Sequence, residues 1–178
     1  MTEEAYLLLW KRRLRERVLV DIPEFRGTPM SLVEKAVELK HAEEKDERRG
    51  RGSKHDEYWC VFDVDTHPYL REAVELAHSE SIRPAISNPC IELWFLLHFA
   101  DQTSYLTSHE ATRLVKSQTG PGKGLTPDTL EVLGERFTIA RERARSLEAK
   151  HRSDGTLAPG NPSSGVWRVV DSIAKPPG

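Results

Sequence analysis

The stretch Ser87–Phe99, with the sequence SNPCIELWFLLHF, constrains the fold of this chain more than any other segment. Residues 91–99 are apolar on almost every side, with Glu92 and His98 as the polar exceptions. A helix that is apolar all round has to be buried. Asn88 and the proline after it are a helix-start signal, with Asn at the N-cap and Pro in the first turn, and Asn161 with Pro162 repeats this signal before the closing helix. We therefore predict a buried helix that other elements surround.

A second stretch, Tyr58–Asp65 (YWCVFDVD), predicts a buried strand that ends in two acids. Its first five residues are aromatic, β-branched or apolar, as in a buried strand. Asp63 and Asp65 alternate along the chain, so on an extended backbone they point the same way. Two carboxylates at the end of a buried strand are a common way to hold a hard cation such as Mg²⁺. Acidic pairs in this position also cap helices or close turns, so both interpretations stay open.

The order of the predicted elements places the chain in the α/β class. Apolar patterns and turn signals predict strands over 18–22, 58–64 and 82–86. Helices are expected from residue 2, from Ser31 to about 41, and over 69–78, 88–100, 108–116, 129–150 and 166–173. The early alternation predicts a mostly parallel sheet flanked by helices, followed by a helical C-terminal portion. Ligands of such sheets lie beyond the carboxyl ends of the strands, where Asp63, Asp65 and Asn88 fall.

Three further side chains bear on a site. Glu92 adds a third carboxylate in the first turn of the buried helix, although an acid there also compensates the helix dipole. His98 lies on an apolar face and is better explained as a hydrogen-bonded core histidine than as a ligand. His67, beside the acidic pair, titrates near neutral pH and is the better candidate for chemistry, with a plain surface residue as the alternative.

Composition bounds the class of protein. The 178 residues, 38% hydrophobic and 30% charged, predict one soluble globular domain over 1–178. No apolar run approaches a membrane span, and the N-terminus begins with acids, unlike a secretory signal. Cys60 and Cys90 lie in apolar contexts and predict buried thiols in a cytoplasmic protein. The net charge of −2 gives no global attraction to nucleic acid, so any such contact needs a local patch.

Residues 42–57 predict a flexible, exposed, charged loop, because the segment has two glycines and no apolar anchor. Arg48, Arg51 and Lys54 in this loop are candidate contacts to nucleic acid or another anion. A solvated linker is the alternative. Asn88 joins them as a fourth candidate contact, after its expected role as a helix cap.

Three motifs together resemble the RloB family, small proteins encoded within some bacterial restriction loci. They are FDVD at 62–65, SNPCIELWFLLHF at 87–99 and GNPSSGVWRVVDSI at 160–173. GTPMSLVEKAVEL at 27–39 also resembles the early helix of the family, so the likeness covers nearly the whole chain.

The RloB family in turn resembles the TOPRIM superfamily of primases, topoisomerases and OLD-type nucleases. The resemblance implies a TOPRIM-like fold, Mg²⁺ or Mn²⁺ at Asp63 and Asp65, and phosphodiester chemistry on nucleic acid. From its place in the sequence, and not from the resemblance, we add Glu92 as a third candidate acid. It also implies a role in defence against phage and an RloA-like or OLD-like ATPase partner.

The opening of the chain departs from the family pattern, and two other functions stay open. Only Thr2 and Glu3 remain of an E-G-x-x-T-E-like stretch, so the first strand and the first acid would precede Met1. A misassigned start, a truncated chain or a degenerate copy would each explain this. The second hypothesis is therefore a catalytically inactive binding or regulatory subunit. The third is a haloacid-dehalogenase-type phosphatase, whose D-x-D-x-T signature resembles residues 63–66 and would make Asp63 the nucleophile and Asp65 the acid/base.

Overall fold

The computed structural model describes residues 2–15, 18–64, 69–120, 125–156 and 159–174. The chain forms two compact units, which we describe one at a time. The larger unit comprises residues 1–22, 63–65 and 86–178, and the smaller unit comprises residues 23–62 and 66–85. No helix in the described part of the chain is both long and apolar enough to cross a membrane.

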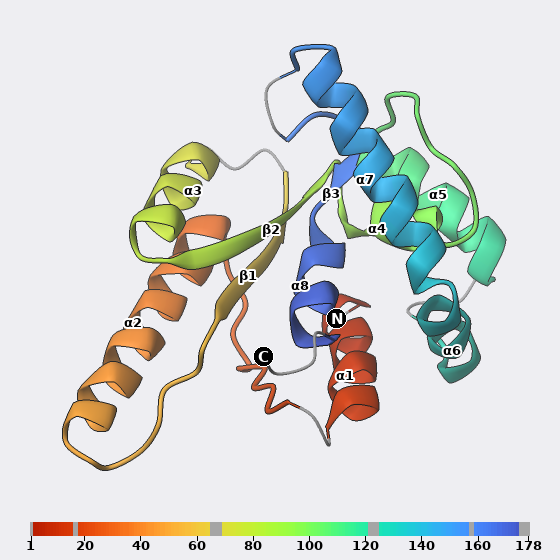
Figure 1. Ribbon diagram of the computed structural model, residues 1–178. Helices are drawn as coiled ribbons and strands as arrows, with labels where there is room; N and C mark the ends of the chain where they lie inside the picture. Colours follow the sequence, from red (N-terminus) through yellow and green to blue (C-terminus); the bar gives the residue numbers. More distant parts are fainter. Residues whose placement is uncertain (1, 16–17, 65–68, 121–124, 157–158, 175–178) are drawn as a thin grey trace. The chain divides into compact units, whose positions relative to one another are not determined.

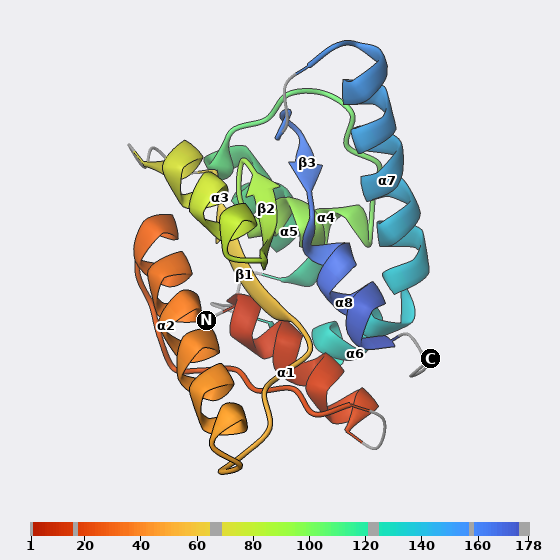
Figure 2. The same ribbon diagram turned by 60° about the vertical axis from the view of Figure 1, so that its left-hand side comes forward.

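The smaller unit is built from two helices and two strand segments. They are α2 (Pro29–Arg48), α3 (Leu70–Ser79), most of β1 (Tyr58–Asp63) and the first half of β2 (Ile82–Asn88). The two helices lie side by side (Figures 1 and 2). Val33 of α2 and the two alanines Ala73 and Ala77 of α3 are fully buried, so small side chains allow close approach.

Helix α2 differs from the prediction at both of its ends. It begins one turn earlier than expected, because Thr28 is the N-cap and its hydroxyl accepts from the backbone N–H of Ser31. It also continues to Arg48 instead of ending near residue 41, so the first seven residues of the predicted loop are helical. Lys40 supports this extension through an ion pair with Glu44 at 3.5 Å and a hydrogen bond to the carbonyl of Glu80 at 2.9 Å.

The larger unit is organised around the short apolar helix α4. Its elements are α1 (Thr2–Leu14), α4 (Ile91–Leu97), α5 (Ser108–Thr119), α6 (Pro127–Glu135), α7 (Phe137–Ser153), β3 (Ser163–Ser164) and α8 (Val166–Ala174). Helix α4 packs against α5, α7 and β3, and every residue of it except Glu92 is buried. The prediction of a buried helix is confirmed. Tyr6 of α1 meets Trp94, Phe95 and His98 edge to face, with ring centroids 5.7–6.1 Å apart.

The α/β class is confirmed, but the sheet is smaller than predicted and is mixed. Three strands lie in the order β1-β2-β3, and β3 runs antiparallel to β2, with Ser87 opposite Ser164 and Asn88 opposite Ser163. The predicted strand over 18–22 is wrong, because those residues form no strand in the structure. Leu19 is 75% exposed, and the alternating Val18, Val20 and Ile22 are only half-buried, so the segment packs through one side without pairing as a strand.

The two Asn-Pro pairs do not start helices, which corrects the prediction. Both bonds, Asn88-Pro89 and Asn161-Pro162, are cis. Asn88 ends β2 and Cys90 is the N-cap of α4, while β3 separates Asn161 from α8. The single helix predicted over 129–150 is two helices that join at Arg136, two residues after the weak helix former Gly134 in the last turn of α6.

Candidate functional site

Asp63 lies at the carboxyl end of β1, as predicted, and is half-buried. The backbone N–H of Val64 donates to the carbonyl of Ser87 at 2.7 Å. In a parallel pair this bond sets Val64 opposite Asn88, and therefore Asp63 opposite Ser87 on the same face of the sheet. The hydroxyls of Ser87 and Ser164 lie 3.0 Å apart and are buried. Asp63 therefore heads a polar row across the three strands.

Cys90 links Asp63 to Glu92. Burial, together with the hydrogen bond and charge of Glu92 and the charge of Asp63, raises the pKa of the Cys90 thiol to about 12. Both carboxylates therefore act on one thiol, which is only 6% exposed. Glu92 is half-buried in the first turn of α4, where the positive end of the helix dipole favours a carboxylate. Asp63 and Glu92 are thus both near enough to Cys90 to influence its thiol.

The predicted metal centre is only partly within the described residues. Asp65 and His67 lie outside them. Within the described part of the chain, no three His, Cys, Asp or Glu side chains form a group that could hold a metal ion. Asp63 and Glu92 do offer carboxylate oxygens, the ligands that Mg²⁺ and Mn²⁺ prefer. The described residues therefore fit two ligands of such a centre.

Asn88 has a structural role that the sequence did not indicate. Its amide nitrogen donates to the carbonyl of Pro159 at 2.7 Å, and its amide oxygen accepts from Asn161 at 3.2 Å. The side chain of Asn161 also bonds both the N–H and the carbonyl of Leu106. The two Asn-Pro turns are tied together in this way, beside Ser87 and the start of α4. A contact between Asn88 and nucleic acid stays a prediction and would compete with these bonds.

The other predicted nucleic-acid contacts lie in the smaller unit, at the end of α2 and in the turn that follows. Arg48, Arg51 and Lys54 are exposed. Arg48 donates to the carbonyl of Glu44 at 3.2 Å, and Lys54 forms an ion pair with Glu47 at 3.2 Å. Part of their charge is therefore compensated locally.

Sequence reasoning missed a network in the same segment. Glu43 accepts from the ring and the backbone N–H of His55 at 2.9–3.0 Å and from the hydroxyl of Tyr58 at 2.5 Å. Burial acts to raise the pKa of Glu43, but these hydrogen bonds outweigh it and hold that pKa below its usual value. The network fastens the end of the predicted loop to α2.

His98 is a core histidine, as predicted. It is 1% exposed, and its Nδ1 donates to the carbonyl of Trp94 at 2.8 Å. Burial lowers its pKa to about 4, and the charges of Arg143 and Arg136 act in the same direction. The neutral ring therefore belongs to the core of the larger unit. Both cysteines are free and buried, which also agrees with the sequence prediction.

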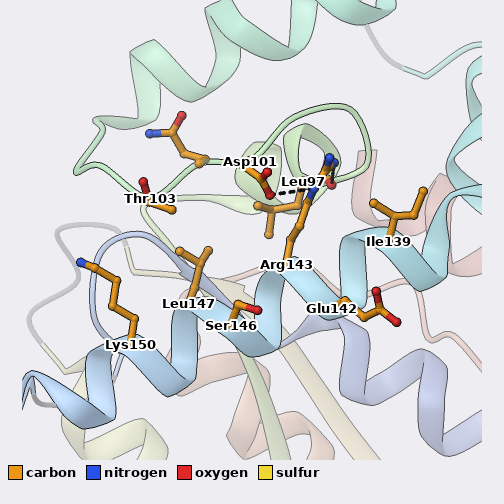
Figure 3. A pocket seen from close by; sticks show the side chains of 10 residues that line it. Leu97, Asp101, Thr103, Ile139, Glu142, Arg143, Ser146, Leu147 and Lys150 are labelled. Carbon is orange, nitrogen blue, oxygen red and sulfur yellow. Dashed lines mark hydrogen bonds and ion pairs between the residues drawn. The ribbon is translucent and has the colours of Figure 1, made fainter.

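The larger unit also contains an open cavity of about 380 Å³ between one face of α7 and the loop after α4 (Figure 3). Arg143 crosses it, with Nη1 donating to the carbonyl of Leu97 at 2.7 Å and Nε at 2.9 Å from Asp101. Neither Asp63 nor Glu92 lines this cavity. We therefore treat the carboxylates, and not the cavity, as the candidate site.

The fold and the site define a small α/β protein with an acid, Asp63, at the end of a strand and a second, Glu92, in the first turn of a buried helix. Comparison with protein families makes this specific: the model of the RloB-like protein family matches residues 1–173, and the chain belongs to that family. Neither a curated protein nor a solved structure matches the chain.

Proposed function

We propose that this RloB-like protein is a divalent-metal-dependent nuclease of the TOPRIM type that acts in bacterial defence. The observation that carries the proposal is the place of Asp63 at the carboxyl end of β1, beside the end of β2, which leads into the first turn of α4 where Glu92 lies. Asp65, two residues beyond Asp63, is a further acid of the proposed centre, by its place in the sequence. A bound Mg²⁺ or Mn²⁺ would supply Lewis-acid activation at a phosphodiester.

The chain itself contributes an anionic, partly buried setting. Asp63 and Glu92 are both half-buried, so their charges are less screened than those of surface acids. Cys90 does not serve as a nucleophile here, because a thiol whose pKa is about 12 is protonated at neutral pH. The buried pair Ser87 and Ser164 satisfies its own hydroxyls and fixes the strand ends next to Asp63. These features favour metal-assisted hydrolysis over covalent catalysis by cysteine.

Calorimetric titration with Mg²⁺ and Mn²⁺ tests the metal centre. We expect binding by the wild-type chain and its loss in Asp63→Asn, Asp65→Asn and Glu92→Gln. Glu142→Gln, an exposed acid of α7 in the cavity, is the matched control and should bind as the wild type does. A folded wild-type chain that binds neither cation would contradict the proposal.

A second readout separates binding from catalysis. A cation held by Asp63 and Glu92 would neutralise the two charges that raise the pKa of Cys90. The thiol pKa, followed by NMR of the cysteine β-carbon, should therefore fall on addition of Mg²⁺. If the cation binds and DNA and RNA remain uncut, the function is that of a binding or regulatory subunit, which is the alternative we retain.

A further inference from the structure

Helix α7 presents a stripe of arginines that sequence reasoning did not single out. Arg141, Arg145 and Arg152 follow one another at spacings of four and seven residues, which on a helix places them along one side. Arg145 and Arg152 are exposed. Because one turn rises about 5.4 Å, the stripe extends over about three turns.

The aromatic side chain of Trp167, on α8, lies against this stripe. Helices α7 and α8 contact each other and lie side by side (Figure 2). The guanidinium carbon of Arg145 lies 5.8 Å from the indole centroid and that of Arg168 lies 4.7 Å from it. Trp167 donates from Nε1 to Glu148 at 3.3 Å, and Arg168 forms an ion pair with the same Glu148 at 2.6 Å. The half-buried indole therefore holds two guanidinium groups on the surface of the larger unit.

The charge of this surface is not balanced. Arg141 is paired with Asp171 at 2.9 Å and Arg168 with Glu148. Within the described residues, neither Arg145 nor Arg152 forms an ion pair. Arg145 and Arg152 are thus the two arginines of this surface whose donors are not taken up by an ion pair, in a chain whose net charge is −2.

The stacking of Arg145 on Trp167 holds the guanidinium group of Arg145 in an orientation that suits the binding of an anion. A cation–π contact uses the face of the guanidinium and leaves the N–H donors in its plane available. Holding the long side chain against the ring also lowers the entropy lost when a ligand binds. A planar set of donors in this state matches the oxygens of a phosphate group.

We propose that the surface formed by Arg141, Arg145, Arg152, Trp167 and Arg168, the α7/α8 basic face, binds the phosphodiester backbone of single-stranded nucleic acid. The inference deepens the proposed function, on which it rests for its substrate class, by naming where that substrate is held. Phosphates along a strand meet Arg145 and Arg152, which lie two turns apart on α7. Bases contact the guanidinium planes of the arginines that Trp167 holds, which accept any base.

The salt dependence of binding tests this surface directly. A labelled single-stranded DNA oligonucleotide and its RNA counterpart are titrated with the whole chain over a series of salt concentrations, with fluorescence anisotropy as the readout. Each phosphate contact contributes about 0.7 to the slope of log K against log salt for a single strand. Arg145→Gln and Arg152→Gln should therefore each reduce the slope by about 0.7, and the double variant by about 1.4. Arg145→Lys keeps the charge and should restore the slope.

Two controls keep the result specific. Arg113→Gln removes one exposed arginine from α5 of the same unit and should leave the slope unchanged. Trp167→Phe keeps an aromatic ring between the arginines and should bind almost as well, but it should lose most of the tryptophan quenching that nucleic acid causes.

The outcomes separate this inference from the proposed nuclease. If the wild-type chain binds nucleic acid and neither Arg145→Gln nor Arg152→Gln changes the slope, the α7/α8 basic face is not the binding surface, while the metal centre stands on its own calorimetry. If the slope falls as expected and the carboxylates bind no metal, the surface is supported and the nuclease is not. Binding of poly-glutamate, and of neither DNA nor RNA, would overturn the inference in favour of an acidic protein.

Discussion

The two asparagines of this chain, Asn88 and Asn161, are hydrogen bonded to each other, and removing one should destabilise the folded chain. The Asn161 side chain accepts from the N–H of Leu106 at 3.1 Å, donates to the carbonyl of Leu106 at 2.9 Å and donates to Asn88 at 3.2 Å. Asn161→Ala deletes these bonds and leaves three half-buried polar atoms unsatisfied. At about 0.5–1.5 kcal/mol for each bond, we expect a loss of about 2–4 kcal/mol in the free energy of unfolding.

Replacing the same side chain by an acid adds a pH dependence of known sign. Asn161→Asp keeps the acceptor that faces the N–H of Leu106 but sets a carboxylate oxygen against the carbonyl of Leu106 and the amide oxygen of Asn88. The folded state therefore raises the pKa of the introduced carboxyl above its unfolded value of about 4. The protonated form can donate, so the variant should be most stable below that unfolded pKa. It should lose stability as the pH rises through the folded pKa.

Urea denaturation, followed by far-ultraviolet circular dichroism at pH 4 and pH 7, measures both effects. Gln102→Ala is the matched control, because Gln102 makes one exposed hydrogen bond to the carbonyl of Ser104, and it should cost less than about 0.5 kcal/mol. The reasoning is refuted if Asn161→Ala costs less than about 1 kcal/mol. It is also refuted if Asn161→Asp is no more stable at pH 4 than at pH 7, relative to Asn161→Ala.

Three other changes test the packing of the two units. Burial lowers the pKa of His98 from 6.5 to about 4, so as the pH falls the unfolded chain binds a proton at this histidine before the folded chain does. The free energy of unfolding of the wild type should therefore drop by up to about 3 kcal/mol relative to that of His98→Gln through this pH window. Equal pH profiles of the two proteins in urea denaturation would contradict this expectation. Tyr58→Phe removes the hydroxyl that donates to Glu43, so the pKa of Glu43, measured by carboxyl NMR, should rise toward its ordinary value. The stability that the depressed pKa adds at a pH above the unfolded pKa of Glu43 should then become smaller. Gly160→Ala would bring a Cβ within 2.7 Å of the ring of His151, so thermal unfolding should show a loss of about 1–3 kcal/mol in the free energy of unfolding. An unchanged melting temperature would show instead that the ring moves aside.

The local patterns of the sequence were sufficient for most of the elements. The apolar run after Asn88 does form a buried helix, and the apolar run from Tyr58 does form a strand that ends at Asp63. The closing amphipathic pattern forms α8, with Val166, Val169 and Val170 buried. Each of these follows from side-chain periodicity within one segment, which a sequence displays directly.

Local patterns failed where long-range partners decide the conformation. The strand predicted over 18–22 is absent because a strand needs a partner strand, and these residues pair with none in the sheet β1-β2-β3. Asn88 and Asn161 read locally as helix caps, yet they are 73 residues apart in sequence and bond to each other. No pattern within either segment predicts a hydrogen bond between the two side chains.

The sequence by itself determined the α/β class, the buried α4, the acid at the end of β1 and, through its motifs, the resemblance to the RloB family. Tertiary structure alone decided the mixed sheet, the approach of Asp63 and Glu92 to Cys90, and the stacking of Arg145 and Arg168 on Trp167. The physical reason is the distance along the chain over which each interaction acts, because helix and strand periodicity is set by neighbours a few residues away. A charge, a hydrogen bond or a stacked ring depends on which distant segments the folded core holds together.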